Sequence, residues 1–372
     1  MKRILLAVFV WLILLNLVNV VSSRLIFDKT SYELPKGVSL PMRHLTVPWA
    51  NFDGRNYLKI AIDGYDPNYY LDLKVFFPAY PLLIRILSFN LFLNPVVAGL
   101  FASLMFFVAA LVMIDKVLSI DKTKENNRHK TILLVLAFPT SFFFASLYTE
   151  SLFLFLAVTS FYFMRKRNFV LASILVAIAT ATRITGLALI PPLLWESYTA
   201  YREKGRIPWW VLVSPLGLAF YGAYLHTISG EFFAFMFGQN HWNRSIGLLS
   251  PYNAFREGLI NALHGSQITR HDFIGRSMEV FEVAFAVLFV ALLVISFRKM
   301  RFSYWLYGVG CAIPVFFSGI LSSVHRYIIV VFPLFFFLVK SMPKKYFYAW
   351  LVISSILLAY MAALFFRGYW VA

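Results

Sequence analysis

The sequence has little cysteine and little charge. It contains one cysteine in 372 residues, which excludes an intramolecular disulfide and any metal centre built from several cysteines. Charged residues make up 14% of the chain, whereas soluble domains carry about 25%. Together with a hydrophobic content of 60%, this composition excludes an ordinary soluble globule.

The sequence also lacks the motifs of nucleotide-dependent and zinc-dependent enzymes. It has no glycine-rich phosphate loop, no dinucleotide fingerprint and no pair of histidines with the spacing of a helical zinc motif. The seven histidines are scattered along the chain, so we expect neither a metal nor any other cofactor. An enzyme of this composition would take its donor substrate from the bilayer.

What the chain does contain is a series of apolar runs, several of them long enough to cross a membrane. About 20 apolar residues in a helix that rises 1.5 Å per residue span a hydrocarbon core of about 30 Å. The runs predict an all-α polytopic membrane protein with about eleven transmembrane helices, the first of them retained and not cleaved as a signal peptide. The predicted spans are 4–21, 95–118, 131–147, 151–164, 169–182, 186–198, 208–228, 277–297, 304–321, 327–339 and 346–366.

The positive charge follows this topology. Lys and Arg outnumber Asp and Glu by 34 to 17, and more than half of them lie at the N-terminus or in five short loops. If the first helix starts in the cytoplasm, all five loops are cytoplasmic, as the positive-inside rule requires. The net charge therefore indicates orientation, and we expect no nucleic acid partner. The five loops are 116–130, 165–167, 202–206, 298–301 and 340–345.

Two large loops are then left on the opposite face. We expect a single domain over 1–372, with a first extracytoplasmic loop at 22–94 that carries helices lying at the membrane interface, and a second one at 229–276. The short spans between 151 and 198 can be half-helices that meet near the outer boundary and place Arg183 at membrane depth. The candidate chemistry is thus concentrated on the outer face.

The first outer loop offers several carboxylates for catalysis. A short amphipathic helix is predicted over 56–62, because its apolar residues recur at positions i, i+3 and i+4. Asp53 precedes this helix, whereas Asp63 and Asp66 follow it. A carboxylate at the membrane surface can accept the proton of an acceptor hydroxyl. Chemistry alone does not separate the three, and the alternative for Asp53 is that it only caps the helix.

Charged residues recur at the later outer turns. Glu150 follows Thr149 and can bind a sugar hydroxyl or orient a cation, unless the turn is simply a helix cap made by Thr149. Arg183 and Arg326 place guanidinium groups beside apolar stretches, and His325 adjoins the second of them. A planar set of donors suits a phosphate, although arginines can also extend to lipid headgroups. The two arginines predict a site for one lipid-linked phosphate.

The second large loop adds a group of hydrogen-bond donors around an indole. Gln239, Trp242 and Arg244 lie close together in the sequence. An aromatic ring of this kind can stack on a sugar face, or it can anchor the loop at the membrane interface.

Five sequence blocks, in order across about residues 49 to 335, resemble the PIG-V family of GPI mannosyltransferases. They include Phe-Phe-Pro-Ala-Tyr-Pro at 76–81 and Ala-Thr-Arg-Ile-Thr-Gly at 181–186, and the short loops are more similar to those of the prokaryotic members. The second large loop also looks similar to the later loop of that family. The remaining blocks are 49–65, 138–140 with 148–151, and 326–327 with 332–333.

The resemblance implies an inverting glycosyltransferase of the GT-C type. Its donor would be a polyprenyl-phosphate sugar, commonly dolichyl-phosphate mannose, and its acceptor would be lipid- or glycan-linked. The family's acidic position in the first outer loop matches Asp53, which is then the catalytic base. In the mechanism that we expect, substrate-binding roles fall to Arg183 and Arg326, with Lys59 or His325 assisting, and to Glu150, Gln239, Trp242 and Arg244. Such an enzyme would lie in the plasma membrane of a prokaryote or the endoplasmic reticulum of a eukaryote.

Two other classes of protein are consistent with the composition. A transporter or flippase of lipid-linked substrates would also use intramembrane arginines, but it would place its charges near the bilayer midplane between two repeated halves. Here the charges crowd the predicted outer face, and no internal repeat is visible. A non-catalytic scaffold subunit would instead tolerate the loss of Asp53, Arg183 and Arg326.

Overall fold

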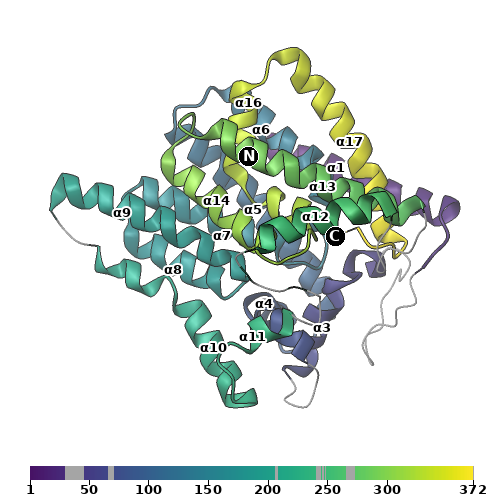
Figure 1. The fold of residues 1–372 in the computed structure, drawn as a ribbon, viewed down its shortest axis with the longest axis horizontal. Coiled ribbons are helices and arrows are strands. Elements are labelled where there is room, and N and C mark those ends of the chain that lie inside the picture. Colours follow the sequence, from purple (N-terminus) through teal and green to yellow (C-terminus); the bar gives the residue numbers. More distant parts are fainter. Residues whose placement is uncertain are drawn as a thin grey trace.

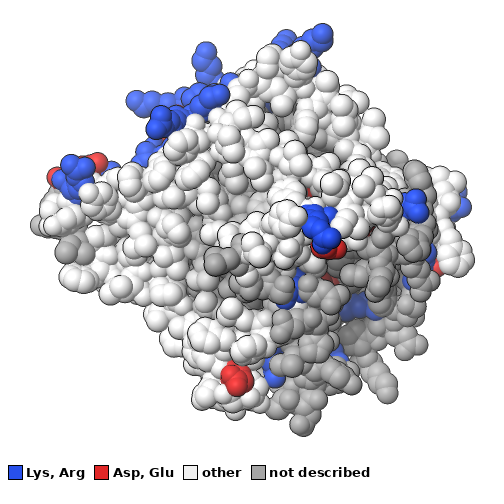
Figure 2. All heavy atoms as spheres, in the orientation of Figure 1, with Lys and Arg blue, Asp and Glu red and all other residues white. Residues whose placement is uncertain are grey.

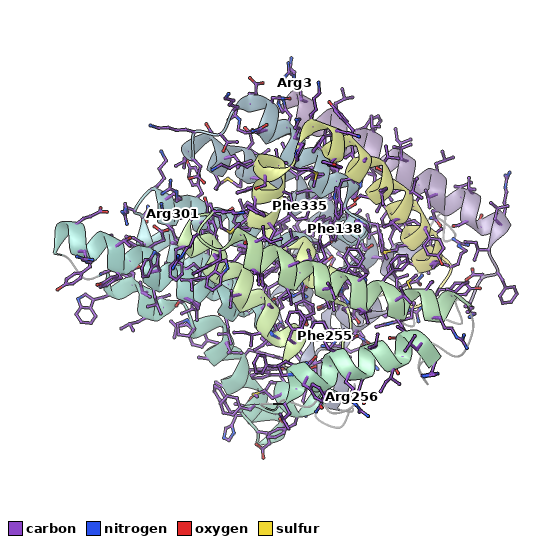
Figure 3. All side chains as sticks on the ribbon, turned by 45° about the horizontal axis from the view of Figure 1, so that its top comes forward. Arg3, Phe138, Phe255, Arg256, Arg301 and Phe335 are labelled. Atoms are coloured by element: carbon purple, nitrogen blue, oxygen red, sulfur yellow. The ribbon has the colours of Figure 1, made fainter. Side chains whose placement is uncertain are left out.

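All regular elements within the described residues are helices, which confirms an all-α polytopic membrane protein (Figure 1). The computed structural model describes residues 1–29, 46–65, 71–205, 208–239, 244, 247, 249–264 and 273–371. The helices pack around a core of aromatic and aliphatic side chains. Phe138 and Phe335, which are far apart in the sequence, lie side by side in this core with ring centroids 5.5 Å apart (Figure 3).

Five helical segments in the described part of the chain are long and apolar enough to cross a membrane. They agree closely with the predicted spans at 4–21, 95–118, 208–228, 277–297 and 346–366. Three shorter apolar helices, α8 (Phe169–Thr180), α14 (Phe302–Phe316) and α16 (Phe332–Ser341), also fall on predicted spans, but these lengths do not confirm a count of eleven. The long segments are α1 (Lys2–Leu25), α5 (Pro95–Ile120), Trp209–Ser229, which includes α10 (Leu216–Ser229), α13 (Phe273–Ser296) and α17 (Lys344–Phe366).

Prolines interrupt two of the predicted spans. The predicted span 131–147 is not one helix, because α6 (Glu125–Ala137) ends before Pro139 and a 3-10 turn follows at Ser141–Phe144. Proline has no N–H to donate and disfavours a helical conformation in the residue before it. The predicted span 327–339 is likewise divided, into α15 (Val324–Ile329) and α16, where Pro333 stands in the first turn.

The predicted first outer loop contains the expected short helices. These include a 3-10 turn at Val47–Ala50, then α3 (Asp53–Asp63), and then α4 (Ala79–Leu87), which starts after Pro78. The predicted helix at 56–62 is therefore longer and begins at Asp53. In Figure 1, α3 and α4 lie together in the lower part of the molecule, beside α11 (Ala234–Phe237) of the second loop; α12 (Ser250–His264) lies farther up.

The remaining helices bring the predicted cytoplasmic loops together at one end of the bundle. Helix α7 (Glu150–Arg165) ends next to Asp121, and α9 (Ile190–Lys204) carries Glu196 toward Arg301. Lys and Arg side chains gather along the upper and upper left edge of the molecule in Figure 2. We call the paired residues at this end the Glu196 cluster, which comprises Asp121, Arg165, Glu196, Arg301, Ser303 and Tyr304.

Candidate active site

Four charged side chains from distant parts of the chain meet where α3, α7 and α15 begin. We call Asp53, Glu150, Arg183 and Arg326 the Glu150 cluster. One oxygen of Glu150, Oε1, accepts hydrogen bonds from Arg183 Nη1 at 3.1 Å and from Arg326 Nε at 3.0 Å, and it forms an ion pair with Arg326 Nη2 at 2.9 Å. Arg326 Nη1 donates to Asp53 Oδ2 at 2.8 Å. The structure thus brings the predicted base into direct contact with Arg326 and links both to Arg183 through Glu150.

The four side chains differ in their access to solvent. The side chain of Glu150 is fully buried, Arg183 is 13% exposed, and Asp53 is the most open at 19%. Two guanidinium groups face two carboxylates, so the formal charges balance. Charges can be kept in a protein interior at acceptable cost when they are paired in this way.

Aromatic rings surround both arginines. The guanidinium carbon of Arg326 lies 4.7 Å from the ring centroid of Tyr148 and 4.9 Å from that of Phe143. Arg183 lies over the rings of Phe153 and Tyr327, at 5.6 and 5.4 Å. A cation over an aromatic face is attracted by the quadrupole of the ring, so these contacts hold the two guanidinium groups in fixed positions.

Backbone contacts fix the position of Asp53. The preceding residue, Phe52, has a φ of 55°, which a non-glycine residue seldom adopts. The Tyr148 hydroxyl donates to the carbonyl of Asn51 at 3.0 Å, and the side chain of Asn51 donates to Phe365 O at 2.9 Å. Phe52, and not Asp53, occupies the cap position of α3. The interpretation of Asp53 as only a helix cap is therefore wrong.

Close packing places Arg183 next to Glu150. Helix α8 ends at Thr180, and the amide of Ala79 donates to the carbonyl of Ala181 at 3.0 Å, which ties the turn to the first outer loop. A Cβ atom at Gly186 would lie 2.4 Å from the carbonyl oxygen of Ala179, so only glycine fits there. Thr149 occupies the cap position of α7, as the alternative interpretation predicted, but its side chain makes no capping hydrogen bond.

Both carboxylates of the Glu150 cluster have unused hydrogen-bonding capacity. Glu150 Oε2 is buried and has no hydrogen-bond partner among the described residues. Asp53 uses only Oδ2, and its Oδ1 makes no hydrogen bond within the described part of the chain. An ionised carboxylate has about four acceptor positions. The cluster is therefore incompletely satisfied.

Tyr57 belongs to the same site, although the sequence did not single it out. It lies one helical turn after Asp53 on α3, and its ring packs against Phe76 and Tyr80. Burial raises the pKa of Tyr57 above its usual value, and the negative charges of Asp53 and Glu150 raise it further. Tyr57 therefore stays protonated and keeps its O–H as a donor. The sequence did contain a signal for Tyr57, because a residue four positions after Asp53 lies next to it on the same face of the helix.

Other predicted site residues lie away from this cluster. Lys59 is half-buried on α3, turned by about 120° around the helix from Asp53. Asp63 is exposed at the opposite end of the same helix. His325 is buried against α13, with Nδ1 3.6 Å from Glu282. Their roles in binding or catalysis stay predictions.

The second large loop is described only in part. Arg244 Nη1 donates to Gln239 Oε1 at 3.4 Å, so these two predicted residues contact each other. Trp242 and Asp66 lie outside the described residues. Nowhere in the described part do three or more His, Cys, Asp or Glu side chains form a group that could hold a metal ion.

Glu282 is a second residue that sequence reasoning missed. It is a buried carboxylate in α13, one of the membrane-length helices. An ionisable residue inside an apolar run of this length is a candidate functional residue on that ground alone, and this signal was present in the sequence.

The comparisons with known proteins agree with the geometry. No curated protein and no solved structure matches the chain. The sequence model of the family described as "Mannosyltransferase (PIG-V)" matches residues 1–201, more than half of the chain and a range that includes Asp53, Glu150 and Arg183. The chain belongs to the mannosyltransferase (PIG-V) family.

Proposed function

We propose that this protein transfers mannose from a polyprenyl-phosphate donor to a hydroxyl of a lipid- or glycan-linked acceptor, with inversion, at the Glu150 cluster. Family membership and the apolar helices make the chain a membrane mannosyltransferase, and the proposal adds the donor, the stereochemistry, the outer side of the membrane and the site. The observation that carries it is the pairing of Asp53 with Arg326 through one carboxylate oxygen only.

In this proposal, Asp53 acts as the general base. Arg326 orients the carboxylate through Oδ2, while Oδ1 is not hydrogen-bonded within the described residues and the side chain is 19% exposed. In the proposed step, Oδ1 takes the proton of the acceptor hydroxyl as that oxygen attacks the anomeric carbon. The bond from the anomeric carbon to the phosphate oxygen breaks, and its electron pair leaves with the lipid phosphate. A single displacement of this kind inverts the anomeric centre.

The two arginines are suited to different tasks. Arg326 donates to Glu150 through Nε and to Asp53 through Nη1, and its Nη2 lies 2.9 Å from Glu150 Oε1 as an ion pair. Arg183 uses only Nη1, and its Nε and Nη2 make no hydrogen bond to the described residues. A guanidinium group carries five N–H donors in a fixed plane, which suits two oxygens of one phosphate. This division supports Arg183 as the contact to the donor phosphate and Arg326 as the residue that orients the base.

The test is a transfer assay on purified protein in lipid nanodiscs, with polyprenyl-phosphate mannose and a glycolipid acceptor. Release of polyprenyl phosphate is measured for the wild type, for Asp53→Asn and for the control Asp63→Asn, which makes the same change at the exposed end of α3. Loss of a general base lowers turnover by about 10²- to 10⁴-fold, so we expect that loss for Asp53→Asn only. Near-normal turnover by Asp53→Asn would remove Asp53 from this role.

A further inference from the structure

Glu282 makes an unusual set of contacts for a carboxylate in a membrane-length helix. Its side chain is only 8% exposed. Oε1 accepts the backbone N–H of Ser323 at 2.7 Å, and Oε2 accepts that of Val324 at 2.8 Å. A carboxylate buried in an apolar helix is costly, which makes a role for it expected. Here the two oxygens together bind two consecutive amides of another segment.

The segment that Glu282 holds leads directly into the Glu150 cluster. Ser323 stands just before α15 with a φ of 61°, in the left-handed region that non-glycine residues seldom adopt. The carbonyl of Ser323 then accepts the amide of Arg326 at 2.9 Å. Contacts that hold Ser323 in this conformation therefore also set the point from which the Arg326 side chain extends.

The neighbouring imidazole does not compete for this carboxylate. His325 Nδ1 is 3.6 Å from Glu282 Oε2, which is beyond hydrogen-bond length, and neither ring nitrogen has a hydrogen-bond partner in the part of the chain that the structure describes. The hydrogen bonds of Glu282 are those to the two amides. Its contribution is thus to the backbone of the segment that carries Arg326.

We propose that Glu282 is a positioning residue of the active site, which holds the start of α15 so that Arg326 can orient Asp53. This inference rests on the proposed function, because it assigns Glu282 an effect on the same base. A displacement of about 1 Å in a catalytic group can lower turnover by about 100-fold. Glu282 would therefore influence turnover without touching the substrate.

The test compares Glu282→Gln with Glu282→Asp and with the control Glu203→Gln, which makes the same chemical change at an exposed side chain. Glutamine keeps the shape of the side chain, but only its oxygen can accept an amide, and its NH₂ group would face the other N–H. For Glu282→Gln we expect kcat per folded protein to fall by about 10- to 100-fold, with the donor KM changed by less than about 3-fold. Aspartate keeps both acceptor oxygens, so Glu282→Asp should recover part of the activity, and Glu203→Gln should resemble the wild type.

Hydrogen–deuterium exchange of the peptide that contains Ser323 and Val324 gives a readout that does not depend on activity. We expect faster exchange in Glu282→Gln than in the wild type. Faster exchange with unchanged kcat would overturn the inference and leave the proposed function intact, and so would a fall in activity that only follows the loss of folded protein. If Asp53→Asn in the same assay is as active as the wild type, the proposed function fails instead.

Discussion

The Glu150 cluster and the Glu196 cluster lie at different ends of the same bundle, and both place buried carboxylates against arginines. In the Glu196 cluster every carboxylate oxygen is bonded. Both oxygens of Glu196 accept from Arg301, and one of them also accepts from Ser303. Asp121 accepts from Arg165 through Oδ1 and from the Tyr304 hydroxyl through Oδ2.

The Glu150 cluster has the same kinds of residue but leaves two carboxylate oxygens without a partner among the described residues. One is the buried Oε2 of Glu150, and the other is Oδ1 of Asp53. A buried acceptor without a partner costs about 1 to 3 kcal/mol. A cluster in which every carboxylate oxygen is hydrogen-bonded is typical of a structural contact between helices. A buried acceptor that is left without a partner is more typical of an active site. The following predictions test this contrast.

The largest contrast is expected from neutralising the central glutamate of each cluster. Glu150→Gln and Glu196→Gln each remove a buried negative charge next to arginine, so both should be destabilised, by up to about 3 to 5 kcal/mol. Only Glu150→Gln should also lower kcat per folded protein, by about 100-fold, because Arg326 loses its second anchor and Asp53 its orientation. The measurement is the transfer assay, normalised to folded protein. Equal kcat in the two variants would contradict the assignment of one cluster to catalysis and the other to structure.

The next effect is expected at the glycines that allow close approach around the Glu150 cluster. Gly186→Ala puts a Cβ 2.4 Å from a backbone oxygen, whereas the corresponding distance at Gly54 is 3.2 Å, to Leu147 O. Because backbone atoms cannot move aside cheaply, Gly186→Ala should destabilise by about 2 to 3 kcal/mol and Gly54→Ala by less.

Thermal unfolding can be followed with a thiol-reactive dye, since Cys311 is the one cysteine and is buried. If Gly54→Ala lowers the unfolding midpoint more than Gly186→Ala does, the close packing at Gly186, which positions Arg183, contributes less to stability than the packing at Gly54.

A smaller effect is expected from exchanging arginine for lysine in each cluster. Arg183→Lys keeps the charge but removes the planar set of donors, so the KM for polyprenyl-phosphate mannose should rise about tenfold with little change in kcat. The matched change Arg165→Lys in the Glu196 cluster should leave this KM unchanged. A kcat loss without a KM change in Arg183→Lys would argue against a contact to the donor phosphate.

The smallest effect is expected at an exposed ion pair near the Glu196 cluster. Arg167 donates to both oxygens of Glu203, but the Glu203 side chain is 58% exposed. Exposed pairs contribute about 0 to 1 kcal/mol and are screened by salt. Glu203→Gln should therefore change the unfolding midpoint by no more than about 2 °C in a chain of this size, and it should leave mannose transfer unchanged. A large loss of activity would mean that the predicted cytoplasmic end takes part in function.

Several parts of the site could be predicted from the sequence because they depend on local patterns. Glu150, Arg183 and Arg326 stand out as charges at the ends of apolar runs, and Asp53 stands out as a carboxylate just before a predicted amphipathic helix. The interrupted spans are harder to predict, because Pro139 lies within an apolar run of uniform hydropathy and its effect on the backbone does not register in hydropathy. Tyr57 was missed because an aromatic residue at helical spacing is usually only part of the core.

The sequence by itself determined the class of protein, the positions of the long apolar helices and the family. Hydropathy and charge act over short stretches of chain, so a reader of the sequence can sum them directly. The tertiary structure alone decided which carboxylate oxygens are bonded and which are not, and that Arg326 and Arg183 have different numbers of donors left. Asp53 and Arg326 are separated by 273 positions. Whether two such groups come within hydrogen-bond distance depends on how all the helices between them pack, and no local pattern contains that information.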